Sequence, residues 1–149
     1  MIRQLDLTDE NVNKAVRSGL HQAADKIMKA QKQLIAGKSQ RLANAITKSS
    51  IYVTKKGVVG VSIGYHSSAF KTDQNGFNAG IVGTVFEFGR PGKRGNTMKQ
   101  NRNGKIYTVK KGVIQPHPHI RRGFHNAAPQ ACQAVIDAIQ NEIDKMGDN

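Results

Sequence analysis

Residues 79–124 read AGIVGTVFEFGRPGKRGNTMKQNRNGKIYTVKKGVIQPHPHIRRGF, and this stretch decides most of the fold. The apolar side chains of 79–88 are spaced in a way that fits a short helix slightly better than a strand. A basic loop is expected at 89–105, where six Lys or Arg and four Gly surround Met98. Loops longer than about 12–15 residues are often functional, so we expect this one to be mobile until a partner orders it.

Two octapeptides on either side of that loop predict strands. Residues 51–58 (IYVTKKGV) and 106–113 (IYTVKKGV) match at six of eight positions, and each reads as a strand that turns at Lys-Gly. The valine-rich segment 58–65 pairs naturally with 50–56 as a hairpin. Two prolines in 115–118 must end the last strand. The β core therefore spans about 49–116 as an antiparallel sheet of three or four strands, with a second mobile loop at 66–78.

Helices are expected on both sides of this core. Apolar residues recur at steps of three and four through 9–36, which predicts one long helix with the stripe Val12, Val16, Leu20, Ala23, Ile27, Ala30 and Leu34. A short helical turn follows within 37–46. A C-terminal helix is predicted over 129–146, because Pro129 suits a first helical position. The fold class is a single α+β domain, residues 1–149, with the C-terminal helix packed on the sheet.

The charge distribution indicates an anionic partner. The net charge is +13, and ten Lys or Arg but no acid lie between Glu87 and Asp137. Such self-repulsion is relieved by DNA phosphates or by an acidic protein surface, while a merely solvated surface is the alternative. Arg121 and Arg122 precede the predicted C-terminal helix, where cations are unfavourable, so we expect compensation from outside the protomer.

Catalysis is poorly supported, and we expect neither enzymatic activity nor a cofactor. The three acids between residues 11 and 136 are too scattered for a carboxylate pair or a metal-dependent nuclease. His117, His119 and His125 lack a nearby acid or cysteine to complete a metal site. The single cysteine, Cys132, excludes an internal disulfide and is expected to be a small buried hydrophobe. No apolar run is long enough to span a membrane, which favours a soluble intracellular protein.

Glu87 is the most informative single acid. It stands between two phenylalanines in cationic surroundings, so it should pair with Arg90, Arg121 or Arg122. Such a pair either fixes the loop within one protomer or joins two subunits.

Glu87-Phe88-Gly89, followed by a loop and by Pro118-His119-Ile120-Arg121 before the last helix, resembles the tail-completion, or head–tail joining, proteins of long-tailed bacteriophages and prophages. The resemblance implies a non-enzymatic virion subunit that is assembled in the bacterial cytoplasm. It closes into a ring in the neck and joins the portal or connector to the tail tube or terminator, with phosphate contact to channel DNA as a further option. The residues expected to contact partners are Glu87, Phe88, Arg90, Lys93, Arg94, Lys99, Arg102, His119, Arg121 and Arg122.

Two other functions remain open from the residues alone. A basic protein that binds double-stranded DNA without sequence preference needs only the Lys and Arg side chains. A tail-tube terminator would share the same sequence features. Ring symmetry, the neck layer, the phage and the host stay undetermined.

Overall fold

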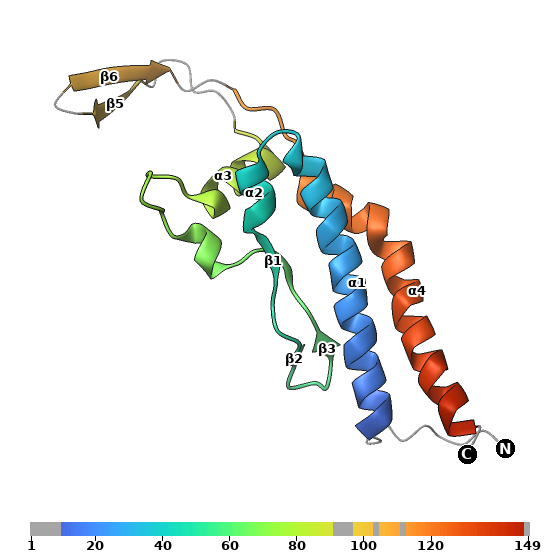
Figure 1. Cartoon of the computed structure of the whole chain (residues 1–149). Coiled ribbons are helices and arrows are strands. Elements are labelled where there is room, and N and C mark those ends of the chain that lie inside the picture. The colour runs from blue at the N-terminus through green and yellow to red at the C-terminus, as the bar shows by residue number, and fades with distance from the viewer. Residues whose placement is uncertain (1–9, 91–96, 103–104, 111–112, 148–149) are drawn as a thin grey trace.

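The computed structural model describes residues 10–90, 97–102, 105–110 and 113–147. It is mostly helical, with two long helices side by side and short strands next to them (Figure 1). In chain order the elements are α1 (Glu10–Ala36), α2 (Gln40–Ala45), β1 (Ile46–Lys48), β2 (Tyr52–Val53), β3 (Val59–Gly60), β4 (Ile63–Tyr65), the 3-10 turn η1 (Ser67–Phe70), α3 (Ala79–Phe88), β5 (Thr97–Arg102), β6 (Lys105–Lys110) and α4 (His119–Gly147). The predicted α+β class, the long first helix and the helix over 79–88 are confirmed.

Helices α1 and α4 run antiparallel and approach closely, because small residues line their contact. A Cβ added to Gly19 would lie 2.9 Å from the Cα of Val135. Near the other end, a Cβ on Gly123 would lie 2.7 Å from the Cα of Gln31. Between these points the core consists of Ala23, Ile27, Ala127 and Ala131. Ile63 of β4 packs on this cluster and so connects the helix pair to the strands.

The buried face of α1 is rotated from the predicted apolar stripe. Val16, Leu20, Ala30 and Leu34 are only half-buried. The buried residues are Val12, Ala15, Gly19, Ala23, Ala24, Ile27, Gln31 and Ile35. The physical reason is that α4 packs closest where side chains are small, so alanine and glycine lie deeper than the larger aliphatic residues.

A second core cluster forms where α2 turns into the strands. Ile35, Leu42, Ala43 and Ile46 are each at most 1% exposed, and residues of β4, α3 and α4 pack around them. Ser39 caps α2, since its hydroxyl accepts a hydrogen bond from the Leu42 backbone N–H at 3.2 Å. The predicted short helical segment before the strands is therefore confirmed.

The predicted hairpin is also confirmed and is longer than expected. β1 pairs with β4 and β2 with β3, both antiparallel, so four short strands form one ribbon in two pairs. Its turn contains Gly57 at φ +77°, a conformation that glycine adopts without strain. The following segment 66–78 contains η1 and several turn hydrogen bonds.

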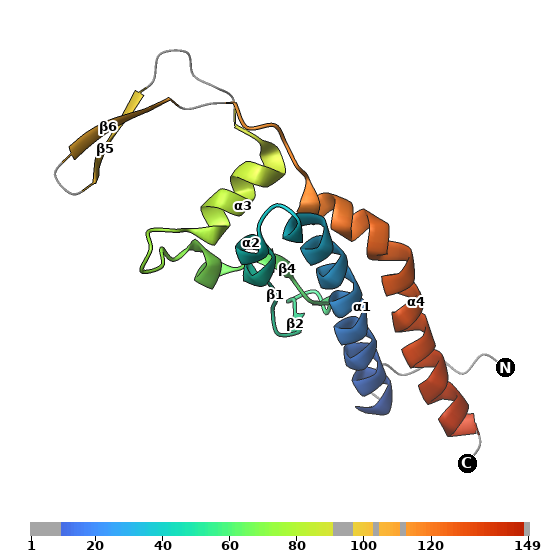
Figure 2. The same cartoon turned by 45° about the horizontal axis from the view of Figure 1, so that its top comes forward.

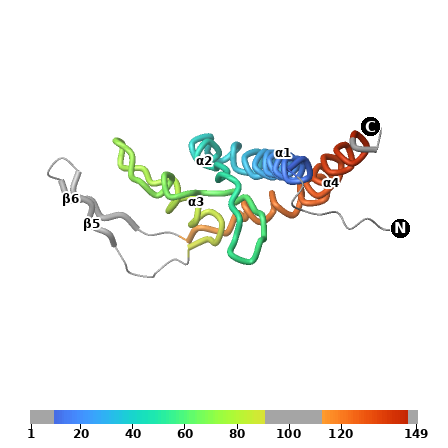
Figure 3. Tube along the Cα trace, turned by 90° about the horizontal axis from the view of Figure 1, so that it is seen from below, coloured from blue at the N-terminus to red at the C-terminus, as the bar shows by residue number. Residues whose placement is uncertain are grey.

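The expectation of a loop throughout 89–105 is wrong for residues 97–102. These residues form β5, which pairs antiparallel with β6 from Thr97 opposite Lys110 to Arg102 opposite Lys105. The polar composition of 97–102 hid the strand, because its ladder depends on pairing with the more strand-like segment 105–110. The β5–β6 hairpin projects from the helical body, and it lies at the opposite end of the molecule from the C-terminal end of α4 (Figures 1 and 2). Seen from below, α3 and the C-terminal end of α4 lie on opposite sides of α1 (Figure 3).

Two predictions about the C-terminal helix are corrected. The helix begins at His119 rather than 129, and Pro129 lies inside it. Proline normally interrupts a helix, so the first ten residues of α4 must be held by contacts elsewhere. Cys132 is exposed, not buried, since Ala131 and Ala134 occupy the face toward α1.

Candidate functional site

Glu87 joins the end of α3 to the beginning of α4. Its side chain is only 5% exposed. One carboxylate oxygen accepts a hydrogen bond from the Ile120 backbone N–H at 2.8 Å, and the other accepts from the Arg121 N–H at 3.1 Å. N–H groups in the first turn have no partner within their own helix, and the positive end of the helix dipole favours a carboxylate. Glu87 therefore caps α4 from a distant part of the chain, which explains why α4 starts before Pro129.

The side chain of Arg121 completes this contact. Its Nε donates to Glu87 Oε1 at 3.0 Å, and its guanidinium carbon lies 5.3 Å from the centroid of the Phe88 ring. Arg121 is thus compensated within the protomer, and the expectation that it needs compensation from outside is wrong. The intramolecular interpretation of Glu87 is confirmed. Phe88 itself is 64% exposed, so its ring and the outer side of Arg121 remain on the surface.

His119 lies beneath this contact and is 1% exposed. Its Nδ1 is 3.0 Å from the His117 carbonyl oxygen and 3.5 Å from Glu87 Oε2, while its Nε2 is 2.8 Å from the Tyr65 hydroxyl. This pattern assigns the proton of a neutral ring to Nδ1, so that the Tyr65 hydroxyl donates to Nε2. Burial, and secondly the charge of Glu87, raise the pKa of Tyr65 to about 12. Through Tyr65, Glu87 and His119 these contacts connect β4, α3 and α4.

Gly89 ends α3 at the base of the β5–β6 hairpin. Its φ is +75°, and an added Cβ would lie 2.8 Å from the Ile114 carbonyl oxygen and 2.9 Å from the Pro116 ring. The next residue, Arg90, forms an antiparallel bridge with Ile114 through two backbone hydrogen bonds of 2.9 Å. A side chain at position 89 would push these two segments apart, so glycine is required by the geometry of the hairpin base.

Around Arg121 the surface has two adjoining hollows. One, of about 270 Å³, reaches from Tyr65 to Phe70 and Phe88, and the other, of about 370 Å³, reaches from Gln31 to Phe124. Both are lined by Ser62, Ile63, Ile120 and Arg121. Phe70 lines the first hollow, and Tyr52 and Phe124 line the second. Each of these three side chains is nearly half exposed. Aromatic rings beside a cation are typical of protein-binding surfaces.

The predicted contact residues lie in different places in the structure. Glu87 and His119 lie inside the protomer and stabilise it, whereas Phe88, Arg121 and Arg122 reach the surface. Arg90 is half-buried at the hairpin base. Lys99 and Arg102 lie on β5, where only the backbone is described, and Lys93 and Arg94 lie outside the described residues.

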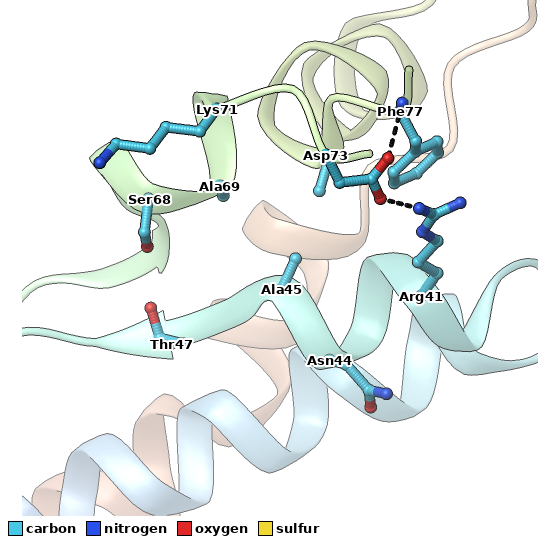
Figure 4. Close-up of a pocket in the computed structure, with 10 residues that line it drawn as sticks. Arg41, Asn44, Ala45, Thr47, Ser68, Ala69, Lys71, Asp73 and Phe77 are labelled. Atoms are coloured by element: carbon cyan, nitrogen blue, oxygen red, sulfur yellow. Dashed lines mark hydrogen bonds and ion pairs between the residues drawn. The ribbon is translucent and has the colours of Figure 1, made fainter. Parts of the chain in front are cut away.

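Sequence reasoning missed a further pocket between α2 and the segment 67–79, with a volume of about 320 Å³ (Figure 4). Arg41 forms an ion pair with Asp73 there, and its guanidinium carbon lies 4.2 Å from the centroid of the Phe77 ring. Asp73 also accepts hydrogen bonds from the backbone N–H groups of Asn75 and Phe77. The Asp-Gln-Asn-Gly sequence 73–76 was the available signal for this turn. These contacts tie the segment to α2, and Lys71 and Thr47 lie at the pocket's edge.

Among the residues that the structure describes, no group of three or more His, Cys, Asp or Glu is placed to hold a metal ion. None of the described helices combines the length and the apolar character that a membrane span requires. No family model, no curated protein and no solved structure matches this chain.

Proposed function

We propose that this chain is a structural subunit of a tailed bacteriophage, of the tail-completion or head–tail joining kind, that assembles into a ring in the neck and connects the portal side to the tail. The observation that carries the proposal is the pair of hydrogen bonds from Ile120 and Arg121 to Glu87. They connect the two short sequence motifs on which the resemblance rests, 87–89 and 118–121, into one structural unit. A motif pair that meets in space is stronger support than two separate short matches.

The surface supports an assembly role rather than a catalytic one. Ile81 and Phe88 on α3 are 57% and 64% exposed, and because they stand seven residues apart they share one side of that helix. Beside them stands a hairpin with cations on both strands, Lys99 and Arg102 on β5 and two lysines on β6. In a ring, each subunit would present these features to a different surface of its neighbour or of the adjoining protein layer, in heterologous contacts that close by rotation.

Negative-stain imaging of the purified untagged protein over a range of concentrations tests the proposal. We expect closed rings with a central hole that admits duplex DNA, at least at high concentration or on addition of the portal-side partner. Single subunits under both conditions, together with normal head–tail joining by a phage that lacks the gene, would contradict it.

Binding to double-stranded DNA is the second candidate, favoured by the absence of acids between Glu87 and Asp137 in a stretch with ten cations. It predicts an affinity that falls steeply with salt, because each neutralised phosphate releases counterions. A filter-binding or anisotropy titration at several salt concentrations measures this slope. If affinity for an unrelated duplex persists at about 0.15 M salt in the absence of rings, this function replaces the neck role.

A further inference from the structure

Helix α4 has a second apolar face next to the face that packs on α1, and it begins at Phe124, which also lines the hollow that reaches Gln31. Phe124 is 48% and Ile136 57% exposed, Cys132 is exposed, and Ala128, Ile139 and Ile143 are half-buried. We call this the outer face, and its members are Phe124, Ala128, Cys132, Ile136, Ile139 and Ile143. They follow at steps of three or four, so they share one side of the helix. In Figures 1 and 2, α1 lies on one side of α4, and no other labelled helix lies beyond α4 on the opposite side.

The charges beside the outer face run against the helix dipole. Arg121 and Arg122 stand in the first turn, which contains no acid. The acids Asp137, Glu142 and Asp144 belong to the second half of the helix, where the one basic residue of the last turn, Lys145, pairs with Glu142. Cations at the N-terminus and acids at the C-terminus are each unfavourable for an isolated helix. Glu87 offsets Arg121 within the protomer, as described above, whereas neither Arg122 nor Asp144 lies beside an opposite charge in any ion pair identified among the described residues.

We infer that a second copy of this chain covers the outer face, with its α4 antiparallel to the first. An antiparallel copy places the acidic half of one helix beside the basic half of the other and also opposes the two dipoles. A parallel copy would instead bring like charges together. Because the basic half, the apolar middle and the acidic half all lie along one helix, a single two-fold axis satisfies both ends at once, and the contact is isologous.

The residue positions define the register of this pairing. With the two-fold axis close to Cys132, Arg122 of one copy comes level with Asp144 of the other, on the same flank of the helix pair. The contact runs from Phe124 to Ile143, about 30 Å at 1.5 Å per residue. One helix pair of this length gives a small interface, so we expect a dissociation constant in the micromolar range. The pairing leaves α3 and the β5–β6 hairpin free, and it does not depend on the proposed neck role.

The first experiment compares two matched variants by sedimentation velocity. Ile136→Asp places a charge in the outer face, and Val58→Asp places the same charge just before β3, at a side chain that is 60% exposed. We expect Ile136→Asp to weaken dimerisation at least about tenfold and Val58→Asp to leave it unchanged, with both variants keeping the wild-type circular dichroism spectrum. A wild-type protein that stays monomeric at high micromolar concentration, or equal effects of the two variants, would overturn the inference.

The second experiment tests the antiparallel arrangement with cysteine pairs. Cys132 is the only cysteine, so an oxidised dimer of the wild type must join Cys132 to Cys132. On a Cys132→Ser background, Arg122→Cys and Asp144→Cys proteins of different tag length are mixed and oxidised. We expect the mixed product to exceed either self-linked product severalfold. Self-linked Arg122→Cys as the main product would mean a parallel pairing and overturn the inference. The crosslinking result does not depend on whether rings appear in negative-stain images. The dimer inference and the proposed neck function can therefore be contradicted separately.

Discussion

Glu87 holds Arg121 by two hydrogen bonds, one from the Arg121 backbone N–H at 3.1 Å and one from its Nε at 3.0 Å. A single buried carboxylate thus both caps α4 and anchors a surface cation. Since α4 also forms the long contact with α1, the stability of the helix pair and the position of Arg121 depend on the same side chain. A substitution of Glu87 should therefore affect both at once.

Glu87→Ala should destabilise the protein by about 2–4 kcal/mol, because it leaves two N–H groups of the first turn of α4 without an acceptor in a buried place. Glu87→Gln should cost less, since its amide oxygen can still accept one of these hydrogen bonds. Urea unfolding followed by circular dichroism measures both. Asp144→Ala, on the exposed end of α4, is the control and should change stability by less than about 0.5 kcal/mol. Similar effects of Glu87→Ala and the control would contradict the capping role.

Gly89→Ala should cost about 1–3 kcal/mol, because a non-glycine residue at φ +75° is strained and its Cβ would press on Ile114 and Pro116. Gly37→Ala is a matched control, since a Cβ there meets nothing within 4 Å. Equilibrium unfolding of the two variants compares them directly. If Gly89→Ala is as stable as Gly37→Ala, the geometry described for the hairpin base is wrong.

Gly123→Ala should push α1 and α4 apart, because the new Cβ would lie 2.7 Å from the backbone of Gln31. Alanine favours a helix by about 1 kcal/mol over glycine, so a loss of stability despite this gain would be a clear sign of steric conflict. We expect a net loss of about 1–3 kcal/mol, measured by thermal or urea unfolding. Unchanged or increased stability would show that the helices are not in close contact at this point.

Tyr65 predicts a dependence of stability on alkaline pH. The pKa of Tyr65 is raised from 10.0 to about 12 in the folded protein, first by burial and then by Glu87. Between these two values the unfolded chain has lost the phenol proton and the folded protein keeps it, so the free energy of unfolding falls as the pH rises. Fully present below pH 10, this contribution is lost as the pH approaches 12.

The tyrosinate absorbance of the folded protein should therefore contain one component that titrates later than the rest. Tyr65→Phe should remove this late component and flatten the fall of stability above pH 10. Tyr52→Phe, at a half-exposed ring, is the control and should leave the late component in place. A late component that survives in Tyr65→Phe would assign it to another tyrosine.

The cations of β5 should matter for assembly and not for folding. Changing Lys99 and Arg102 together to Gln should leave the unfolding free energy within about 0.5 kcal/mol of wild type, and should reduce ring formation or head–tail joining severalfold if the hairpin meets acidic surfaces. Lys26 and Lys29 of α1, changed to Gln, form the control pair. Equal assembly by both double variants would exclude a role for the hairpin charge.

Much of the architecture could be predicted because it depends on local patterns. The 3.6-residue period of 9–36 predicts α1 to within one residue of its observed start, Glu10. The Lys-Gly turn and its flanking valines predict the hairpin that contains Gly57. The residue order favours a helix over 79–88 only slightly, and it predicts a basic partner for Glu87 without deciding between Arg90, Arg121 and Arg122.

Other features were decided only by the tertiary structure. The sequence around Pro129 contains a plausible helix start, but α4 begins ten residues earlier, because Glu87 supplies a cap from a distant part of the chain. β5 has a polar composition and forms because its backbone pairs with that of β6. Cys132 turns outward because the alanines on either side fit more closely against α1. Local periodicity determines which segments become helices, whereas capping, strand pairing and the choice of buried face depend on partners that only the folded chain brings together.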